Sequence, residues 1–269
     1  MMADSTLPDP DRIDGAPHPR ETLALYGQSA AETAFLTAYT AGRLHSGWLI
    51  TGPQGVGKAT LAYRIAAFLL SEQPPEDGLF GAPPPPTSLT IPQDSIDARL
   101  IRAGSHPRLF ILRRGPNQTG DKLSQVISVE QARDLKKFFQ LSAADGGRRV
   151  VIIDSADELN PSAANAILKV LEEPPAKTTL LLISHRPTGL LPTIRSRCRE
   201  LRCATLNSAD LEQALCGAGL TTSSTDALAT LAAGSTGTAI RLQQQDGRRF
   251  MPNWSTCSTA CPGWSGRWP

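Results

Sequence analysis

Short apolar runs alternate with amphipathic stretches along the middle of the chain. Four runs have the length and apolar content of buried strands; they are residues 47–51, 108–113, 149–154 and 178–184. Three stretches carry apolar residues at helical spacing; they are residues 58–70, 128–141 and 160–173. Apolar strands that alternate with helices predict an α/β fold with a parallel sheet covered by helices on both faces.

The helical stretch from residue 160 has signals at both of its ends. Asn160 is a favoured helix cap, and Pro161 suits the first turn. Pro174 and Pro175 cannot continue a helix, so we expect the helix to end just before them.

Composition separates two further regions from this alternating part. Residues 1–24 are rich in Pro, Asp and Thr, which predicts a flexible tail. Residues 74–94 are too rich in proline for a regular element, which predicts an insertion loop.

The segment TGPQGVGKAT, between the first strand and the first helix, nearly matches a phosphate-binding loop. Gly52, Gly57 and Lys58 are in register, but Ala59 takes the position of the usual Ser or Thr hydroxyl. Glycines let backbone amides turn toward phosphates, the helix N-terminus adds positive charge, and Lys58 would reach the terminal phosphates. The alternative is a glycine-rich turn without a ligand, and the flanking strand and helix favour the phosphate loop. The predicted nucleotide-binding residues are Gly52, Gly55, Gly57, Lys58, Ala59 and Thr60.

Asp154 ends the apolar run that begins near residue 149. It would lie at the carboxyl end of a buried strand, which is where open α/β sheets bind ligands. In P-loop enzymes such a carboxylate helps to hold magnesium. An aspartate that merely begins a loop is the alternative, and the preceding P-loop favours the nucleotide site.

Two longer stretches resemble the bacterial clamp-loader AAA+ proteins of DNA polymerase III. They are LYGQSAAETAFLTAYTAGRLHSGWLITGPQGVGKATLA (residues 25–62) and NAILKVLEEPPAKTTLLLISHRPTGLLPTIRSRC (residues 165–198). The resemblance runs from about residue 25 to residue 242 and is greatest to the delta-prime branch of that family. It implies a P-loop AAA+ domain over residues 25–203 and a small helical lid domain over residues 204–248.

The resemblance also implies roles for two more residues. Ser184 ends its strand where the family places a polar sensor of the terminal phosphate, although serine also favours strand ends for other reasons. Arg197, in the Ser-Arg-Cys motif, matches an arginine finger that acts in trans, at the ATP site of a neighbouring subunit. A plain surface arginine beside Arg195 and Arg199 is the alternative for Arg197.

The chain departs from the hydrolysing members of this family at three places. Ala59 lacks the magnesium-binding hydroxyl, Ser155 follows Asp154 in place of a catalytic glutamate, and Gly237 stands near the position of a second sensor arginine. Relatives often carry a four-cysteine zinc module after the first helix, but residues 71–106 contain no cysteine, so we predict no zinc.

These features predict a non-hydrolysing clamp-loader subunit that binds ATP or ADP weakly or as a vestige. The implied partners are clamp-loader ATPase and delta subunits, with the sliding clamp and primer-template DNA reached through the complex. One alternative is an active gamma/tau-like ATPase that uses Thr60 for magnesium and Asp157 or Glu158 as base. Another is a P-loop enzyme outside replication, such as a kinase, which leaves the family motifs unexplained.

Charge and cysteine content add limits to this interpretation. The net charge of +2 gives no strong footprint for gripping nucleic acid unaided. The five cysteines lack paired spacing and the four histidines are scattered, so we predict no metal site. The polar start is no signal peptide and no apolar run is long enough for a membrane span, which predicts a cytoplasmic protein.

The final residues, 249–269, differ from the rest of the chain. They hold three of the four tryptophans and no helical periodicity, and we interpret them as an aberrant, disordered tail. The family would continue there into a helical collar domain, and our hypothesis is that residues after about 250 are read out of frame.

Overall fold

The computed structural model describes residues 9–22, 24–71, 85–117, 119–141, 146–220 and 225–244. Its strands are β1 (Gly47–Thr51), β2 (Leu109–Arg113), β3 (Arg149–Asp154), β4 (Thr178–Ser184) and β5 (Arg199–Arg202). They form one sheet in the order β2-β3-β4-β1-β5, and every pair is parallel. All carboxyl ends of the strands therefore meet at one edge of the sheet.

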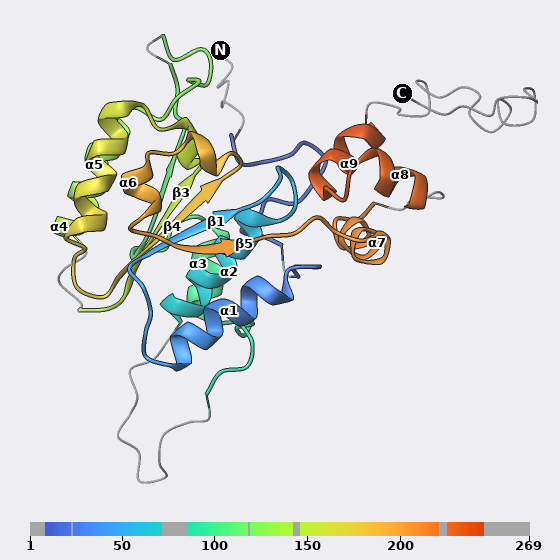
Figure 1. Ribbon diagram of the computed structural model, residues 1–269, viewed down its shortest axis with the longest axis horizontal. Helices are drawn as coiled ribbons and strands as arrows, with labels where there is room; N and C mark the ends of the chain where they lie inside the picture. The colour runs from blue at the N-terminus through green and yellow to red at the C-terminus, as the bar shows by residue number, and fades with distance from the viewer. Residues whose placement is uncertain are drawn as a thin grey trace, which may run out of the picture.

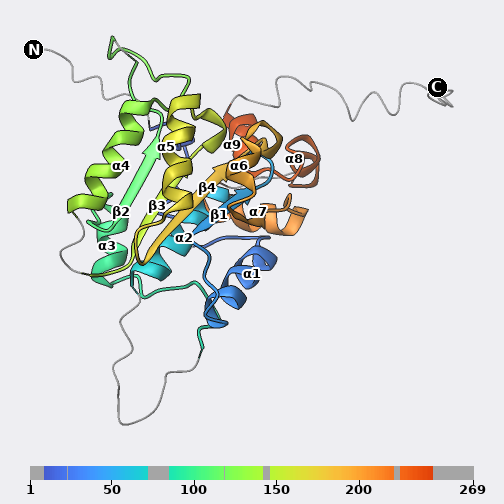
Figure 2. The same cartoon turned by 60° about the vertical axis from the view of Figure 1, so that its left-hand side comes forward.

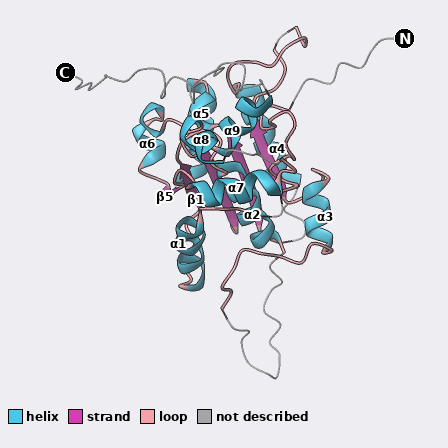
Figure 3. Cartoon of the chain, turned by 90° about the vertical axis from the view of Figure 1, so that its right-hand side faces the viewer, coloured by secondary structure: helices cyan, strands magenta, loops and turns pink. Residues whose placement is uncertain are grey.

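The helices are α1 (Ser29–Thr40), α2 (Lys58–Leu70), α3 (Ile96–Arg102), α4 (Val129–Leu141), α5 (Pro161–Glu172), α6 (Pro192–Arg195), α7 (Ser208–Gly217), α8 (Thr225–Leu231) and α9 (Thr236–Gln244). Figures 1 and 2 show α4 and α5 on one side of the sheet and α1, α2 and α3 on the other. The strands lie between these helical layers, as the colouring of Figure 3 makes clear. The predicted α/β architecture is confirmed.

Alternation along the strands explains why both faces are apolar. On β3, Val150 and Ile152 join the core under α1 and α2, whereas Val151 and Ile153 join the core under α4 and α5. Successive side chains of a strand point to opposite faces, so a strand buried on both sides reads as one continuous apolar run. That is why β1, β3 and β4 have the bounds that the sequence predicted.

The signals around residue 160 act as expected. The Asn160 side chain accepts a hydrogen bond from the backbone N–H of Ala163 at 2.7 Å, which satisfies a free donor of the first turn of α5. The helix ends at Glu172, before Pro174. Both predictions for this helix are confirmed.

Helices α7, α8 and α9, which we call the lid helices, form a separate group beyond β5 (Figure 1). Their apolar side chains, such as Leu211, Leu215 and Ile240, join the same core as α1 and α2. They fall within the range predicted for a lid.

Residues 9–22, which we call the N-terminal strap, lie against the rest of the protein. Asp11 is almost fully buried, forms an ion pair with Arg113, and has its Oδ2 atom 3.2 Å from the Nε2 atom of His18. Burial alone would raise the pKa of Asp11, but His18 and Arg113 lower it to about 2. Further along, Ile13 approaches Gly237.

The prediction of a flexible tail over residues 1–24 is therefore wrong for residues 9–22. Composition shows that a segment is polar. It does not show that the carboxylates of Asp9 and Asp11 pair with Arg113, about a hundred residues away. The polar side chains are held because they are paired.

Four of these elements were not predicted, namely α1, α3, α6 and β5. Strand β5 is short and its side chains are mostly exposed, so it lacks the apolar run of the other strands. In the predicted insertion, residues 85–94 form no helix or strand, whereas residues 74–84, like 249–269, lie outside the described residues. Within the described part of the chain, no helix is long and apolar enough to cross a membrane.

Candidate nucleotide site and the opposite edge of the sheet

The loop between β1 and α2 has the backbone shape that a phosphate cradle needs. Gly52, Gly55 and Gly57 all have positive φ, at 141°, 79° and 96°, and Gly57 caps the start of α2. A Cβ atom on Gly52 would come within 2.4 Å of the Cys203 carbonyl oxygen. Only glycine fits these positions, and the result is a turn that delivers backbone amides to the N-terminus of α2.

Lys58, the first residue of α2, is turned back onto this loop. Its Nζ atom donates to the carbonyl oxygens of Gly52, at 2.7 Å, and Pro53. Burial lowers the pKa of Lys58 to about 8, against smaller opposing effects of Cys203, Asp154 and Asp157. The ammonium therefore remains mostly protonated at neutral pH, which suits it to a phosphate group.

Asp154 lies at the carboxyl end of β3, as predicted. Burial raises its pKa to about 6, the charge of Asp11 adds to this, and a hydrogen bond from Ser155, with Oγ 3.2 Å from Asp154 Oδ1, opposes it. Asp154 is thus ionised at neutral pH. The described residues contain no cluster of three or more His, Cys, Asp or Glu side chains around a possible metal ion.

A nucleotide would be held here by the Gly52–Lys58 loop and a magnesium ion by Asp154. The cradle fits phosphates because its glycines and the α2 N-terminus are correctly shaped. The magnesium site is poorer, since Ala59 offers no oxygen and Thr60 is buried inside α2.

Ser155 and His185 form a pair that the sequence did not reveal. The Oγ atom of Ser155 lies 2.9 Å from Nε2 of His185, which follows the last residue of β4. Burial and the charge of Lys58 lower the pKa of His185 to about 4, while Asp157 opposes them. A neutral imidazole and a hydroxyl thus occupy the region next to Asp154.

Ser184, the predicted sensor, is fully buried at the end of β4. Its Oγ donates to Oδ1 of Asp157 at 2.7 Å, and the other oxygen of Asp157 accepts the backbone N–H groups of His185 and Arg186. Asp157 therefore fixes the end of β4. The neighbouring Glu158 is ion-paired with Arg114, with Oε2 2.9 Å from Nε.

The lid helices contact the phosphate loop directly. The backbone N–H of Gly237 donates to the Gly55 carbonyl oxygen at 3.0 Å. The Ser235 hydroxyl donates to the backbone carbonyl oxygen of Gln54 at 2.8 Å. A Cβ atom on Gly237 would lie 2.9 Å from the Gly55 Cα and 2.8 Å from Ile13. We call these two hydrogen bonds the lid latch; they need a residue without a side chain at 237.

Gln28 joins the same loop to the start of the lid region. Its amide donates to the carbonyl oxygens of Val56 at 3.1 Å and Ala204 at 2.8 Å, and it accepts the Ala204 N–H at 2.9 Å. Because Gln28 is buried and fully bonded, it fixes Ala204 relative to the loop.

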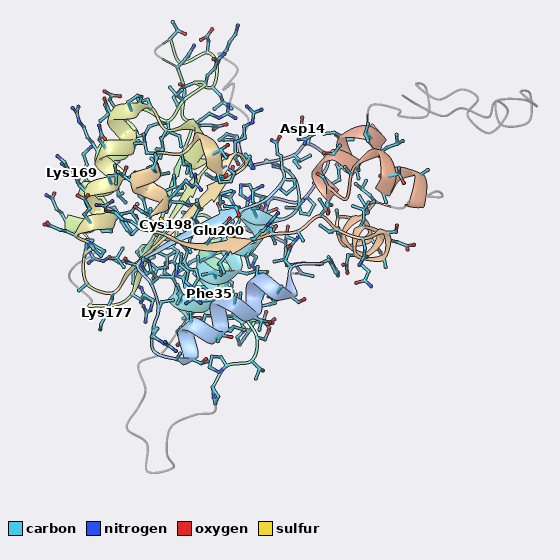
Figure 4. All side chains as sticks on the ribbon, viewed as in Figure 1. Asp14, Phe35, Lys169, Lys177, Cys198 and Glu200 are labelled. Atoms are coloured by element: carbon cyan, nitrogen blue, oxygen red, sulfur yellow. The ribbon has the colours of Figure 1, made fainter. Side chains whose placement is uncertain are left out.

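Arg197 lies away from this site. It follows α6 and precedes β5, so it belongs to the amino edge of the sheet, opposite the carboxyl ends of the strands. Its guanidinium donates to the Thr193 carbonyl oxygen at 3.0 Å and pairs with Glu172 at 2.9 Å, and its side chain is 37% exposed. In Figure 4 the adjacent Cys198 lies on the side of the sheet away from the lid helices. The structure brings the other predicted site residues together but not Arg197.

Comparison with known proteins agrees with these features. A model of the family described as "DNA polymerase III, delta subunit" matches residues 27–207. DNA polymerase III subunit delta' of Pseudomonas aeruginosa is 41% identical over 156 residues, which cover 58% of this chain and 42% of the relative. The same subunit of Escherichia coli is 32% identical over 237 residues, which cover 84% of this chain and 61% of that subunit. This chain thus spans less than two thirds of the length of either relative.

More distant similarities extend the same picture. The tau subunit of Escherichia coli DNA polymerase III is 30% identical over 197 residues, covering 72% of this chain and 27% of that subunit. A Thermotoga maritima RuvB Holliday junction branch migration motor superposes with a TM-score of 0.50 at 16% identity, over 84% of this chain and 65% of that one. The latter likeness shows the P-loop AAA+ fold alone.

The fold, the P-loop and the match over residues 27–207 agree, and the chain belongs to the DNA polymerase III delta subunit family.

Proposed function

We propose that this chain is a delta-prime-type subunit of a bacterial clamp loader and that it does not hydrolyse ATP itself. The observation that carries the proposal is the Ser155–His185 pair beside Asp154, because an ATPase needs a base at that position. The delta' relatives support the clamp-loader role.

The side chains near Asp154 are poor general bases. A serine hydroxyl has no useful basicity near neutral pH, and the lowered pKa of His185 makes its imidazole a weak base. Asp157 already accepts three hydrogen bonds, and Glu158 is paired with Arg114. Among the described residues around Asp154, no side chain is poised to activate a water molecule.

We expect ATP or ADP to bind weakly. The glycines and Lys58 retain the shape and charge for phosphates, but Lys58 must first leave the Gly52 and Pro53 carbonyl oxygens. A bound nucleotide would bring its negative phosphate charge to the loop. The residues of this chain would bind the nucleotide without cleaving it. The missing hydroxyl at Ala59 weakens magnesium binding further.

Arg197 is proposed to act at the ATP site of a neighbouring subunit. Its position at the opposite edge supports this, since there it is half exposed and held by Glu172 and the Thr193 carbonyl oxygen. A guanidinium neutralises charge that develops on a transferred phosphoryl group. The proposed partners are clamp-loader ATPase and delta subunits, with the sliding clamp and primer-template DNA reached through them, in the cytoplasm.

A second candidate is an active ATPase of the gamma/tau type, which the similarity to tau favours. It would need Thr60 as a magnesium ligand and Asp157 or Glu158 as the base. The burial of Thr60 and the contacts of both carboxylates argue against it. A P-loop enzyme outside replication has no observation in its favour.

Steady-state ATP hydrolysis by the purified chain tests the proposal, with Lys58→Ala as the matched variant. We expect no turnover by either protein. Turnover of about 1 per second or more that Lys58→Ala abolishes would show that the chain is itself an ATPase.

A further inference from the structure

A hollow separate from the P-loop lies about two turns further along α2 from Lys58. It is bounded by the end of the N-terminal strap, α2, α3 and the loop before α3, and its volume is about 50 Å³. Among the described residues that line it are three arginines, Arg20 from the strap, Arg64 from α2 and Arg102 from α3, and no acidic residue. Helices α2 and α3 pack against each other, and the ring of His18 in the strap lies edge-on to that of Tyr63 in α2, with centroids 5.8 Å apart.

The charge of these arginines is only partly compensated. Arg64 is ion-paired with Glu32, with Nε 2.9 Å from Oε1, whereas Arg102 donates to the backbone carbonyl oxygen of Gln93, which carries no formal charge. The Nε atom of Arg20 is enclosed and has no hydrogen-bond partner among the described residues. A guanidinium N–H without a partner is costly to enclose, so Arg20 is the least satisfied of the three arginines.

The floor of the hollow is apolar. Leu89, Ala98 and Ile101 are buried there, so water screens the guanidinium charges less than at an open surface. Thr90 also lines the hollow, and its hydroxyl oxygen accepts a hydrogen bond from Arg64 at 3.4 Å. Guanidinium groups around a small apolar base suit an oxyanion.

We propose that this hollow binds one phosphate group, held by Arg20, Arg64 and Arg102. The volume has room for a few water molecules and hence for one tetrahedral oxyanion, but not for a nucleoside. Donors from three separate elements suit a tetrahedral group better than a planar carboxylate. The phosphate belongs either to a free ion or to a nucleic-acid backbone, and both offer the same chemistry. The site is distinct from the P-loop and does not depend on the proposed function.

The test is a titration with inorganic phosphate, followed by the NMR signals of the arginine Nε–H groups at constant ionic strength. It uses the full chain carrying Lys58→Ala, so that the P-loop does not contribute. We expect the Arg20 Nε–H signal to shift and saturate. Arg20→Gln and Arg102→Gln should each weaken phosphate binding by about tenfold or more, because each removes a charged donor. Arg133→Gln, on the exposed face of α4, is the matched control and should leave the affinity unchanged.

Two results would overturn the proposal. One is an Arg20 signal that does not respond to phosphate while the protein remains folded by circular dichroism. The other is equal weakening by Arg20→Gln and Arg133→Gln, which would show only diffuse attraction. A short single-stranded oligonucleotide then separates the two sources. If the oligonucleotide reverses the shift that phosphate causes in the Arg20 signal, the phosphate group that binds here belongs to nucleic acid. If the shift remains, the ligand is the free phosphate ion.

Discussion

The two edges of the sheet treat their charged residues differently. At the carboxyl edge, Lys58 is buried and Asp154 and Asp157 are partly buried, and each of the three is hydrogen-bonded to its own chain. At the amino edge, the Arg197 side chain is 37% exposed, and its partners among the described residues are on α5 and α6. A charged side chain that is bonded to its own chain is suited to stabilising the fold. An exposed charged side chain that is held in one orientation is suited to binding a partner. Under the proposed function, the amino edge, and not the phosphate loop, is the part of this chain that takes part in ATP hydrolysis.

The largest effect should follow from Arg197→Ala, measured as ATP hydrolysis by a reconstituted clamp loader. Loss of an arginine finger lowers the rate by about a thousandfold or more. Stability of the isolated chain should change by less than about 1 kcal/mol, because the Arg197–Glu172 pair is at the surface. Arg195→Ala, on exposed α6, is the control and should leave the rate nearly unchanged. Full activity of the Arg197 variant would show that the amino edge has no such role.

The next effect concerns the rigidity of the carboxyl edge. Gly52→Ala should lower the free energy of unfolding by about 2–4 kcal/mol, since a Cβ atom there meets the Cys203 carbonyl oxygen and the backbone has positive φ. Gly42→Ala is a matched control, with φ of 66° and nothing within 4 Å of a Cβ atom. It should cost about 1 kcal/mol. Urea denaturation measures both, and equal losses would mean that the close approach to Cys203 is unimportant.

A pH series tests the burial of Asp154. The folded pKa of about 6 is above the ordinary value of 3.8, so the native state holds a proton that the unfolded state releases between about pH 4 and pH 6. The contribution of this group to stability is therefore present below pH 4 and lost as the pH rises through 6. The difference in unfolding free energy between wild type and Asp154→Asn should fall by about 1–2 kcal/mol over that range. A constant difference would place Asp154 in a more hydrated setting.

The smallest effect is expected at the lid latch. Ser235→Ala removes the hydrogen bond to the Gln54 carbonyl oxygen and a cap of α9, where Ser235 Oγ also accepts from the Thr238 N–H at 3.1 Å. We expect a loss of about 1 kcal/mol in the unfolding free energy, read from thermal or urea melts. Ser196→Ala, whose hydroxyl bonds a surface carbonyl oxygen, should change stability by less. Equal effects would mean that the latch adds nothing beyond an ordinary surface contact.

What the sequence could predict depended on how far apart the cooperating residues are. The phosphate loop and the Asn160 cap are encoded within a few neighbouring positions, and both were found in the pattern. The bond between Gln28 and Ala204 joins residues 176 positions apart, and the Asp11–Arg113 pair joins residues 102 apart. Neither leaves a local signature.

The Ser155–His185 pair depends on strand order. Those residues follow β3 and β4, and they meet only because these two strands are neighbours in the sheet. The clue available in the sequence was that polar residues ended two adjacent buried runs. It located the region of the site, but it did not specify which side chains bond to each other.

The N-terminal strap has a consequence for how the protein is made. The backbone carbonyl oxygen of Asp14 accepts a hydrogen bond from the side-chain amide of Gln244. The first described part of the chain therefore contacts the last described helix (Figure 4). Ribosomes add about 5–20 residues per second, so roughly ten to fifty seconds separate the emergence of these two residues. The Asp11 side chain can pair with Arg113 earlier, but Ile13 and Asp14 must wait for the lid. Nascent chains should therefore protect the strap from proteases in two stages.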